Sequence, residues 1–98
     1  MTANRVDRIR TRLEEVFSPN ELEVFDDSHL HEGHVGAKDG KGHYRVYIVS
    51  DQFVRTRPLE RHRMVFKALG EMMEKDIHAL SVVAQPPSSP TIIDTAKD

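Results

Sequence analysis

The sequence predicts a small α+β domain in which helix, strand, strand, helix and strand follow one another. Three observations predict it. The 98 residues leave room for one hydrophobic core. Apolar residues recur at helical spacing in two stretches and at period two, or in a continuous run, in three others. A helix separates the last two strands, which favours parallel pairing by a right-handed crossover, whereas the first two strands should pair antiparallel. The result is a three-stranded mixed sheet covered by helices on one face.

The first helix is predicted over residues 4–17. Its apolar positions lie on one face, with Arg and Glu residues opposite. Asn4 is expected to cap its N-terminus. Ser18-Pro19-Asn20 should end it, because proline lacks the backbone N–H and restricts the residue before it.

Three strands are predicted, over residues 21–25, 43–50 and 79–84. The first two alternate polar and apolar residues, as strands with one buried face do. The third is apolar at almost every position, so we expect it to be central or covered on both faces. Pro86-Pro87 ends it, because consecutive prolines remove ladder donors.

The second main helix is predicted to begin at Pro58, where a missing N–H does least harm. Its inner face extends from Val65 through Leu69 to Met72 and Met73, past Gly70 on the outer face. Before it, Asp51 to Val54 should form a turn anchored by Phe53. The folded domain is expected to span residues 1–84, with a disordered tail over residues 85–98.

Composition excludes several function classes. The formal charge of −2 gives no general attraction to nucleic acid or membranes. There is no cysteine, so disulfides and cysteine nucleophiles are absent and any metal must be held by histidine or carboxylate unless a partner supplies thiolates. No apolar run reaches the ~18 residues of a membrane span. We therefore expect a soluble cytoplasmic protein, without membrane contact, that is not an enzyme.

A loop rich in glycine and histidine separates the first two strands. It covers residues 26–42 and contains His29, His31 and His34. Long ordered loops tend to be functional or mobile. Neutral imidazoles in such a loop can bind a metal, so a stand-alone zinc or nickel site in this loop is one interpretation.

Positive charge gathers around the start of the second main helix. The basic residues of this stretch, against the single acidic Glu60, are Arg55, Arg57, Arg61, Arg63 and Lys67. They form either a solvated surface or a site for anions such as glutathione, a partner's carboxylates or DNA phosphates.

These elements carry a family resemblance over residues from about 5 to 84. The motifs are a loop with Asp26, Ser28, His29, His31, Gly33, His34 and Gly36, the strand His43-Tyr44-Arg45-Val46, then Val49-Ser50 and Phe53, then Pro58-Leu59 with Arg61-His62-Arg63-Met64-Val65, and Ile77-His78-Ala79-Leu80. Together they resemble the BolA family. The resemblance implies a KH-like α+β fold of the second class. One departure is Arg55, where the family usually has glycine.

The resemblance also implies a partner and a cofactor. BolA-like proteins pair with monothiol glutaredoxins and share a 2Fe-2S cluster, and glutathione is supplied on the partner side. His78 would be one ligand and His34 the second, with His31 and then His29 as alternatives. The isolated protein, a monomer or weak homodimer, should hold no cluster. The alternative function is a DNA-binding transcriptional regulator of the stress-response type, using the basic start of the second main helix.

Overall fold

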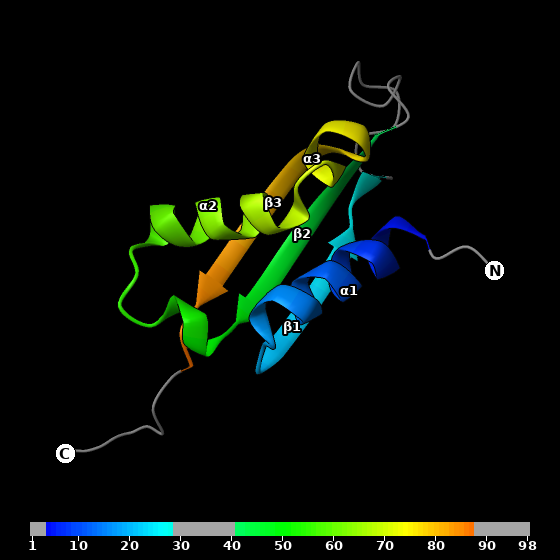
Figure 1. Ribbon diagram of the computed structural model, residues 1–98. Coiled ribbons are helices and arrows are strands. Elements are labelled where there is room, and N and C mark those ends of the chain that lie inside the picture. The colour runs from blue at the N-terminus through cyan, green and yellow to red at the C-terminus, as the bar shows by residue number, and fades with distance from the viewer. Residues whose placement is uncertain (1–3, 29–40, 88–98) are drawn as a thin grey trace.

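Two main helices form one layer across one face of a three-stranded sheet in this computed structural model, which describes residues 4–28 and 41–87 (Figure 1). The elements are α1 (Arg5–Phe17), β1 (Glu21–Asp26), β2 (Gly42–Val49), η3 (Asp51–Phe53), α2 (Pro58–Leu69), α3 (Met72–Lys75) and β3 (Ile77–Gln85). Their order confirms the predicted α-β-β-α-β arrangement, with η3 and α3 as short additions.

The sheet has the predicted mixed pairing. β1 pairs antiparallel with β2, and β2 pairs parallel with β3, so β2 is the central strand. Side chains alternate along β2: Tyr44, Val46 and Ile48 are buried under the helices, and Arg45 is exposed on the other side. We call this second side, which carries Phe25, His43, Arg45, Tyr47 and Val83, the open face.

The prediction that the last strand is central or covered on both faces is wrong. β3 is an edge strand, and Val83 on the open face is 48% exposed while neighbouring Val82 is 8% exposed. β1 already occupies one side of β2, so the crossover through α2 must place β3 on the other side. Its largely apolar sequence reflects small and β-branched side chains on the open face, not a second covering layer.

The second main helix is shorter than the sequence suggests. It ends at Leu69, because Gly70 takes a left-handed φ of 55° and its N–H donates to the carbonyl of Phe66. Glycine adopts that conformation without a Cβ penalty. The chain then forms the separate turn α3, so Met72 and Met73 pack against the core from a different element.

The N-terminal helix forms as predicted. Asn4 accepts a hydrogen bond from the N–H of Asp7 at 2.8 Å, which satisfies one free donor of the first turn. Ile9, Leu13 and Phe17 are buried against the sheet and α2. The amphipathic pattern of the sequence therefore identifies the correct buried face.

The anchor residue of η3 connects the layers. Phe53 is 0% exposed, and its ring centroid lies 5.0 Å from that of Phe17. Buried Ser50 donates its hydroxyl to the carbonyl of Phe17 at 2.8 Å, which ties the end of α1 to the end of β2. These contacts close the sheet end from which α2 starts.

Two sequence expectations fall beyond the residues described. The loop histidines His29, His31 and His34 lie outside them, as do residues 88–98 of the expected tail. Within the described ranges, no helix is both long and apolar enough to cross a membrane.

Candidate functional site

His78 occupies an irregular position at the start of β3. Gly42 of β2 pairs with Ile77, but the next residue, His43, pairs with Ala79. His78 is therefore the extra residue of a β-bulge, and its side chain is exposed. Bulges bend a strand and re-aim side chains near functional sites.

Close packing beneath the bulge explains why glycine stands at position 42. A Cβ on Gly42 would lie 2.5 to 2.6 Å from the ring atoms and hydroxyl of Tyr44, which is itself only 4% exposed. The N–H of Gly42 donates to the carbonyl of Asp76 at 3.0 Å. Gly42 is thus packed against a buried aromatic ring, and its N–H fixes the backbone two residues before His78.

The structure brings His43 next to His78. Their ring centroids lie 5.1 Å apart with a tilt of 45° between the planes. Sequence reasoning used His43 only as a marker for the start of the second strand and missed it as a site residue. The parallel pairing of the two strands was predicted, and it was the signal that could have placed the two histidines together.

Polar groups continue from this pair along the open face. Arg45 donates its Nε to Asp27 at 2.6 Å and stacks its guanidinium 4.3 Å from the ring centre of Phe25. The hydrogen bond to Asp27 raises the pKa of Arg45, so the guanidinium stays charged. Beside the pair lies a cavity of about 270 Å³ whose lining includes Asp27, His43 and Ser81.

Asp76 connects this end of the sheet to α1. Its carboxylate accepts from Arg5 at 3.2 Å and from Arg8 at 3.1 Å, and its side chain is 14% exposed. Because Asp76 is two residues before His78 and its carbonyl accepts from Gly42, these ion pairs hold the base of the bulge.

Replacing Asp76 by asparagine should lower the free energy of unfolding by about 1–2 kcal/mol, since two guanidiniums lose their charge partner in a partly buried setting. Urea unfolding followed by circular dichroism measures this. Glu71→Gln is the matched control: its ion pair with Lys75 is exposed on both sides, so its loss should cost less than about 0.5 kcal/mol. Equal costs for the two variants would contradict the role given to Asp76.

Donor groups for a metal are incomplete in the part of the chain that the structure describes. No group of three or more His, Cys, Asp or Glu side chains there could hold a metal ion. A metal ion bound by His43 and His78 would therefore require further ligands, either from the loop or from another molecule.

Four of the five predicted anion-binding residues are exposed. Arg55 and Arg57 precede α2, Arg63 lies within it, and Lys67 lies in its last turn. The fifth, Arg61, is half-buried and committed to internal hydrogen bonds. It donates to the hydroxyl and carbonyl of Thr56 at 3.0 and 2.8 Å, and to the carbonyl of Ala84 at 3.2 Å. Arg61 thus connects the loop before α2 to the end of β3.

Arg55 has a left-handed φ of 65°, at the position where the family usually has glycine. A side chain in this region costs roughly 1–2 kcal/mol. Arg55→Gly should therefore raise the free energy of unfolding by about 1 kcal/mol after the greater flexibility of unfolded glycine is subtracted. Arg55→Ala, which removes the charge but keeps the Cβ, should change it by less than about 0.5 kcal/mol. Equal effects in urea unfolding would show that charge, not backbone conformation, is responsible.

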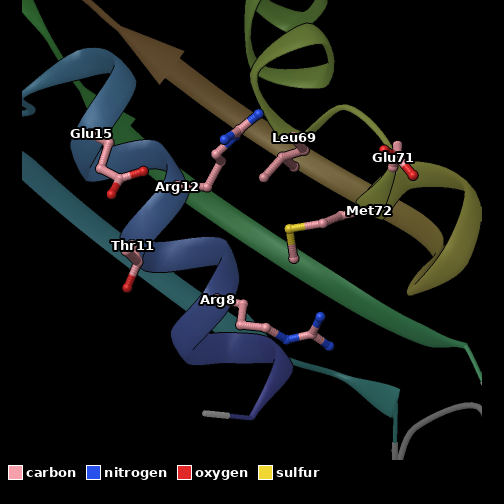
Figure 2. Close-up of a pocket in the computed structure, with 7 residues that line it drawn as sticks. All are labelled: Arg8, Thr11, Arg12, Glu15, Leu69, Glu71 and Met72. Atoms are coloured by element: carbon pink, nitrogen blue, oxygen red, sulfur yellow. The ribbon is translucent and has the colours of Figure 1, made fainter. Parts of the chain in front are cut away.

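A separate groove of about 430 Å³ lies between α1 and the α2–α3 connection. Figure 2 shows Leu69 and Met72 projecting toward α1, and Arg12 projecting from α1 toward α2. Arg12 donates its Nε to the carbonyl of Ala68 at 2.7 Å, near the C-terminus of α2. A cation there complements the partial negative charge of the last carbonyls, so Arg12 joins the two helices.

The geometry defines a small α+β sandwich with a histidine pair at one end of its sheet and a basic loop at the other. Comparison with known proteins assigns its family: a family model described as BolA-like protein matches residues 13–89. The chain belongs to the BolA family.

Individual relatives agree with this assignment. Human BolA-like protein 1 is 41% identical over 80 residues, which cover 82% of this chain and 56% of the human protein. The DNA-binding transcriptional regulator BolA of Escherichia coli K12 is 38% identical over 76 residues, covering 78% of this chain and 70% of that protein. The chain spans about half the length of several curated relatives.

A solved structure confirms the fold. BolA1 from Arabidopsis thaliana superposes with a TM-score of 0.76 at 37% identity, covering 89% of this chain and 96% of that chain. The α+β fold implied by the resemblance, in the order α-β-β-α-β with a three-stranded mixed sheet, is therefore the observed one.

Proposed function

We propose that this protein is a non-enzymatic adaptor in iron–sulfur cluster trafficking or iron and redox sensing. It acts in a heterocomplex with a monothiol glutaredoxin and shares a 2Fe-2S cluster with it. The observation that carries the proposal is the histidine pair at the bulge of β3, in a chain of the BolA family that has no cysteine.

The donor chemistry of this end of the sheet fits such a cluster. His78 is exposed on a rigid strand, and the ring of His43 lies 5.1 Å away. Two imidazoles bound to one metal through bonds of about 2.0–2.1 Å have ring centres roughly 5 Å apart at a tetrahedral angle. The spacing of this pair is compatible with that arrangement.

The ligands of the proposal are His78 and a second histidine of this chain. His34 is the first candidate for the second ligand, followed by His31 and His29, and the position of His43 adds it as a further candidate. The partner's cysteine and glutathione supply the thiolates. Imidazole ligation leaves less negative charge on a cluster than thiolate ligation does, which raises its reduction potential.

The decisive experiment mixes the protein with cluster-loaded monothiol glutaredoxin and records visible absorption and circular dichroism. The wild-type chain should change the spectrum. His78→Ala should abolish the change or weaken complex formation by at least tenfold, since a lost ligand costs at least as much as a lost outer partner. An unchanged spectrum with His78→Ala would refute this ligand assignment.

Single variants of the other histidines identify the second ligand. The variants to compare under the same conditions are His34→Ala, His31→Ala, His29→Ala and His43→Ala, with His62→Ala as a control on α2.

Zinc uptake by the isolated protein tests a stand-alone loop site instead. Uptake that survives His78→Ala but is lost in the His29, His31 and His34 triple variant would favour that site.

The second candidate function is a DNA-binding transcriptional regulator. It is favoured by the four exposed basic residues before and along α2 and by the name of the Escherichia coli relative. Binding to promoter DNA should fall steeply as salt rises and should weaken with Arg57→Ala or Arg63→Ala. Absent or salt-insensitive binding would exclude this function.

A cytoplasmic location is part of both proposals, although the name of an Arabidopsis relative places that protein in the chloroplast.

A further inference from the structure

The outer edge of β3 has the features of a strand-pairing surface. β3 is nine residues long and pairs only with β2 within the described sheet. The carbonyl of Gln85 accepts from Ser50 beside β2, so the backbone groups of alternate residues, Leu80, Val82 and Ala84, point the other way.

Only part of this edge is covered by the described residues. Arg61 donates to the carbonyl of Ala84, which protects the end of the strand. None of the described backbone hydrogen bonds outside the helices and strands involves Leu80 or Val82. Natural edge strands are commonly protected by charges or by proline, but residues 79–85 carry neither.

The two edges of the sheet differ in charge. β1, at the opposite edge, carries Glu21, Glu23 and Asp26. A second copy of β1 would bring like charges together, whereas a second copy of β3 would not. Because residues 79–85 carry no charged side chain, two copies of this edge can pair without repulsion between like charges. A two-fold symmetric contact requires such a self-complementary surface.

We propose that β3 pairs antiparallel with β3 of a second copy of this chain, giving a six-stranded sheet across a two-fold axis at Ser81. This register places Leu80 beside Val82 of the second copy on the helix side. On the open face it places Val83 beside Ala79 of the second copy. Every cross-strand pair at the centre is therefore uncharged. Ala84, whose carbonyl accepts from Arg61, lies at the end of the paired segment, opposite His78 of the second copy.

The position of α2 supports the same partner. The N-terminal half of α2 extends past the outer side of β3 (Figure 1). Leu59 in that half is 62% exposed. The two-fold axis sets the overhanging ends of both α2 helices above the joined strands, where Leu59 becomes covered.

Sedimentation of the full chain across a range of concentrations tests the interface without cluster or glutaredoxin. The wild type should form a reversible dimer, and Val83→Lys should raise its dissociation constant at least tenfold, since an edge lysine must be desolvated on pairing. Val54→Lys is the matched control, because Val54 and Val83 are both 48% exposed. It should leave dimerisation unchanged.

A cysteine scan gives an independent measurement, because the chain has no cysteine of its own. In the proposed register the two Ser81 Cα atoms form a non-hydrogen-bonded pair about 4.5 Å apart, within the range of a disulfide. Mild oxidation should therefore cross-link Ser81→Cys at least tenfold faster than Glu23→Cys on β1.

Three outcomes overturn the proposal. One is a wild-type chain that stays monomeric up to about 1 mM. Another is a dimer that Val83→Lys does not weaken and in which Ser81→Cys and Glu23→Cys cross-link equally fast. The third is a Val83→Lys variant that loses glutaredoxin binding while its self-association is unchanged, which assigns the edge to that partner instead.

Discussion

Replacing Phe53 by alanine should lower the free energy of unfolding by about 3–5 kcal/mol, the usual cost of deleting a buried phenyl ring. Phe53 is 0% exposed and contacts Phe17, so the cavity would open where α1, η3 and the sheet meet. A domain of this size has about 5–15 kcal/mol of stability in total. Urea unfolding and a melting-temperature shift of roughly 15–25 °C provide the measurement.

Phe66→Ala is the control for this prediction. Phe66 is 39% exposed on α2, so its truncation should cost about 1 kcal/mol. A comparable loss for both variants would mean that the phenyl ring of Phe53 is not a central packing element.

Replacing Arg61 by alanine should lower the free energy of unfolding by about 2–3 kcal/mol. Three of its N–H groups bond Thr56 and Ala84, and hydrogen bonds from charged groups contribute more than neutral ones. The loss would free the loop before α2 from the end of β3. Amide hydrogen exchange of residues 54–57, together with urea unfolding, measures the effect.

Arg63→Ala separates stability from anion binding. Arg63 is exposed on the same helix, so its removal should change the free energy of unfolding by less than about 0.5 kcal/mol. If Arg63→Ala destabilises the domain as much as Arg61→Ala, the structural role assigned to Arg61 is not specific. A loss of DNA binding without loss of stability would instead support the second candidate function.

The basic stretch shows what a sequence pattern leaves undecided. Charge counting places Arg61 and Arg63 in one group, because both precede the same apolar helix face. The structure separates them: one guanidinium bonds the loop and the end of β3, while the other is exposed. The difference depends on which helix side faces the sheet edge, and that follows only from the packing of α2.

The candidate metal site was predictable in part. His78 followed from the resemblance, and its proposed partner His34 lies outside the described residues. His43 was not proposed, although period-two alternation placed it on the strand that pairs with β3. The distance between His43 and His78 depends on the bulge, which shifts the register of the two strands by one residue. Neither strand's own sequence pattern indicates such a shift.

Local chemistry alone determined much of this protein. Helical and alternating apolar spacing identified α1 and the buried faces of β1 and β2, and asparagine and proline marked the helix starts. These features depend on neighbouring residues only, so the sequence carries them.

Tertiary packing decided the rest. It made β3 an edge strand, ended α2 at Gly70, set His43 beside His78 and directed Arg61 to Ala84. Each of these four features depends on contacts between residues distant in the chain, or on a backbone conformation that the local sequence does not determine. Only the assembled sheet and helices bring those groups within contact distance.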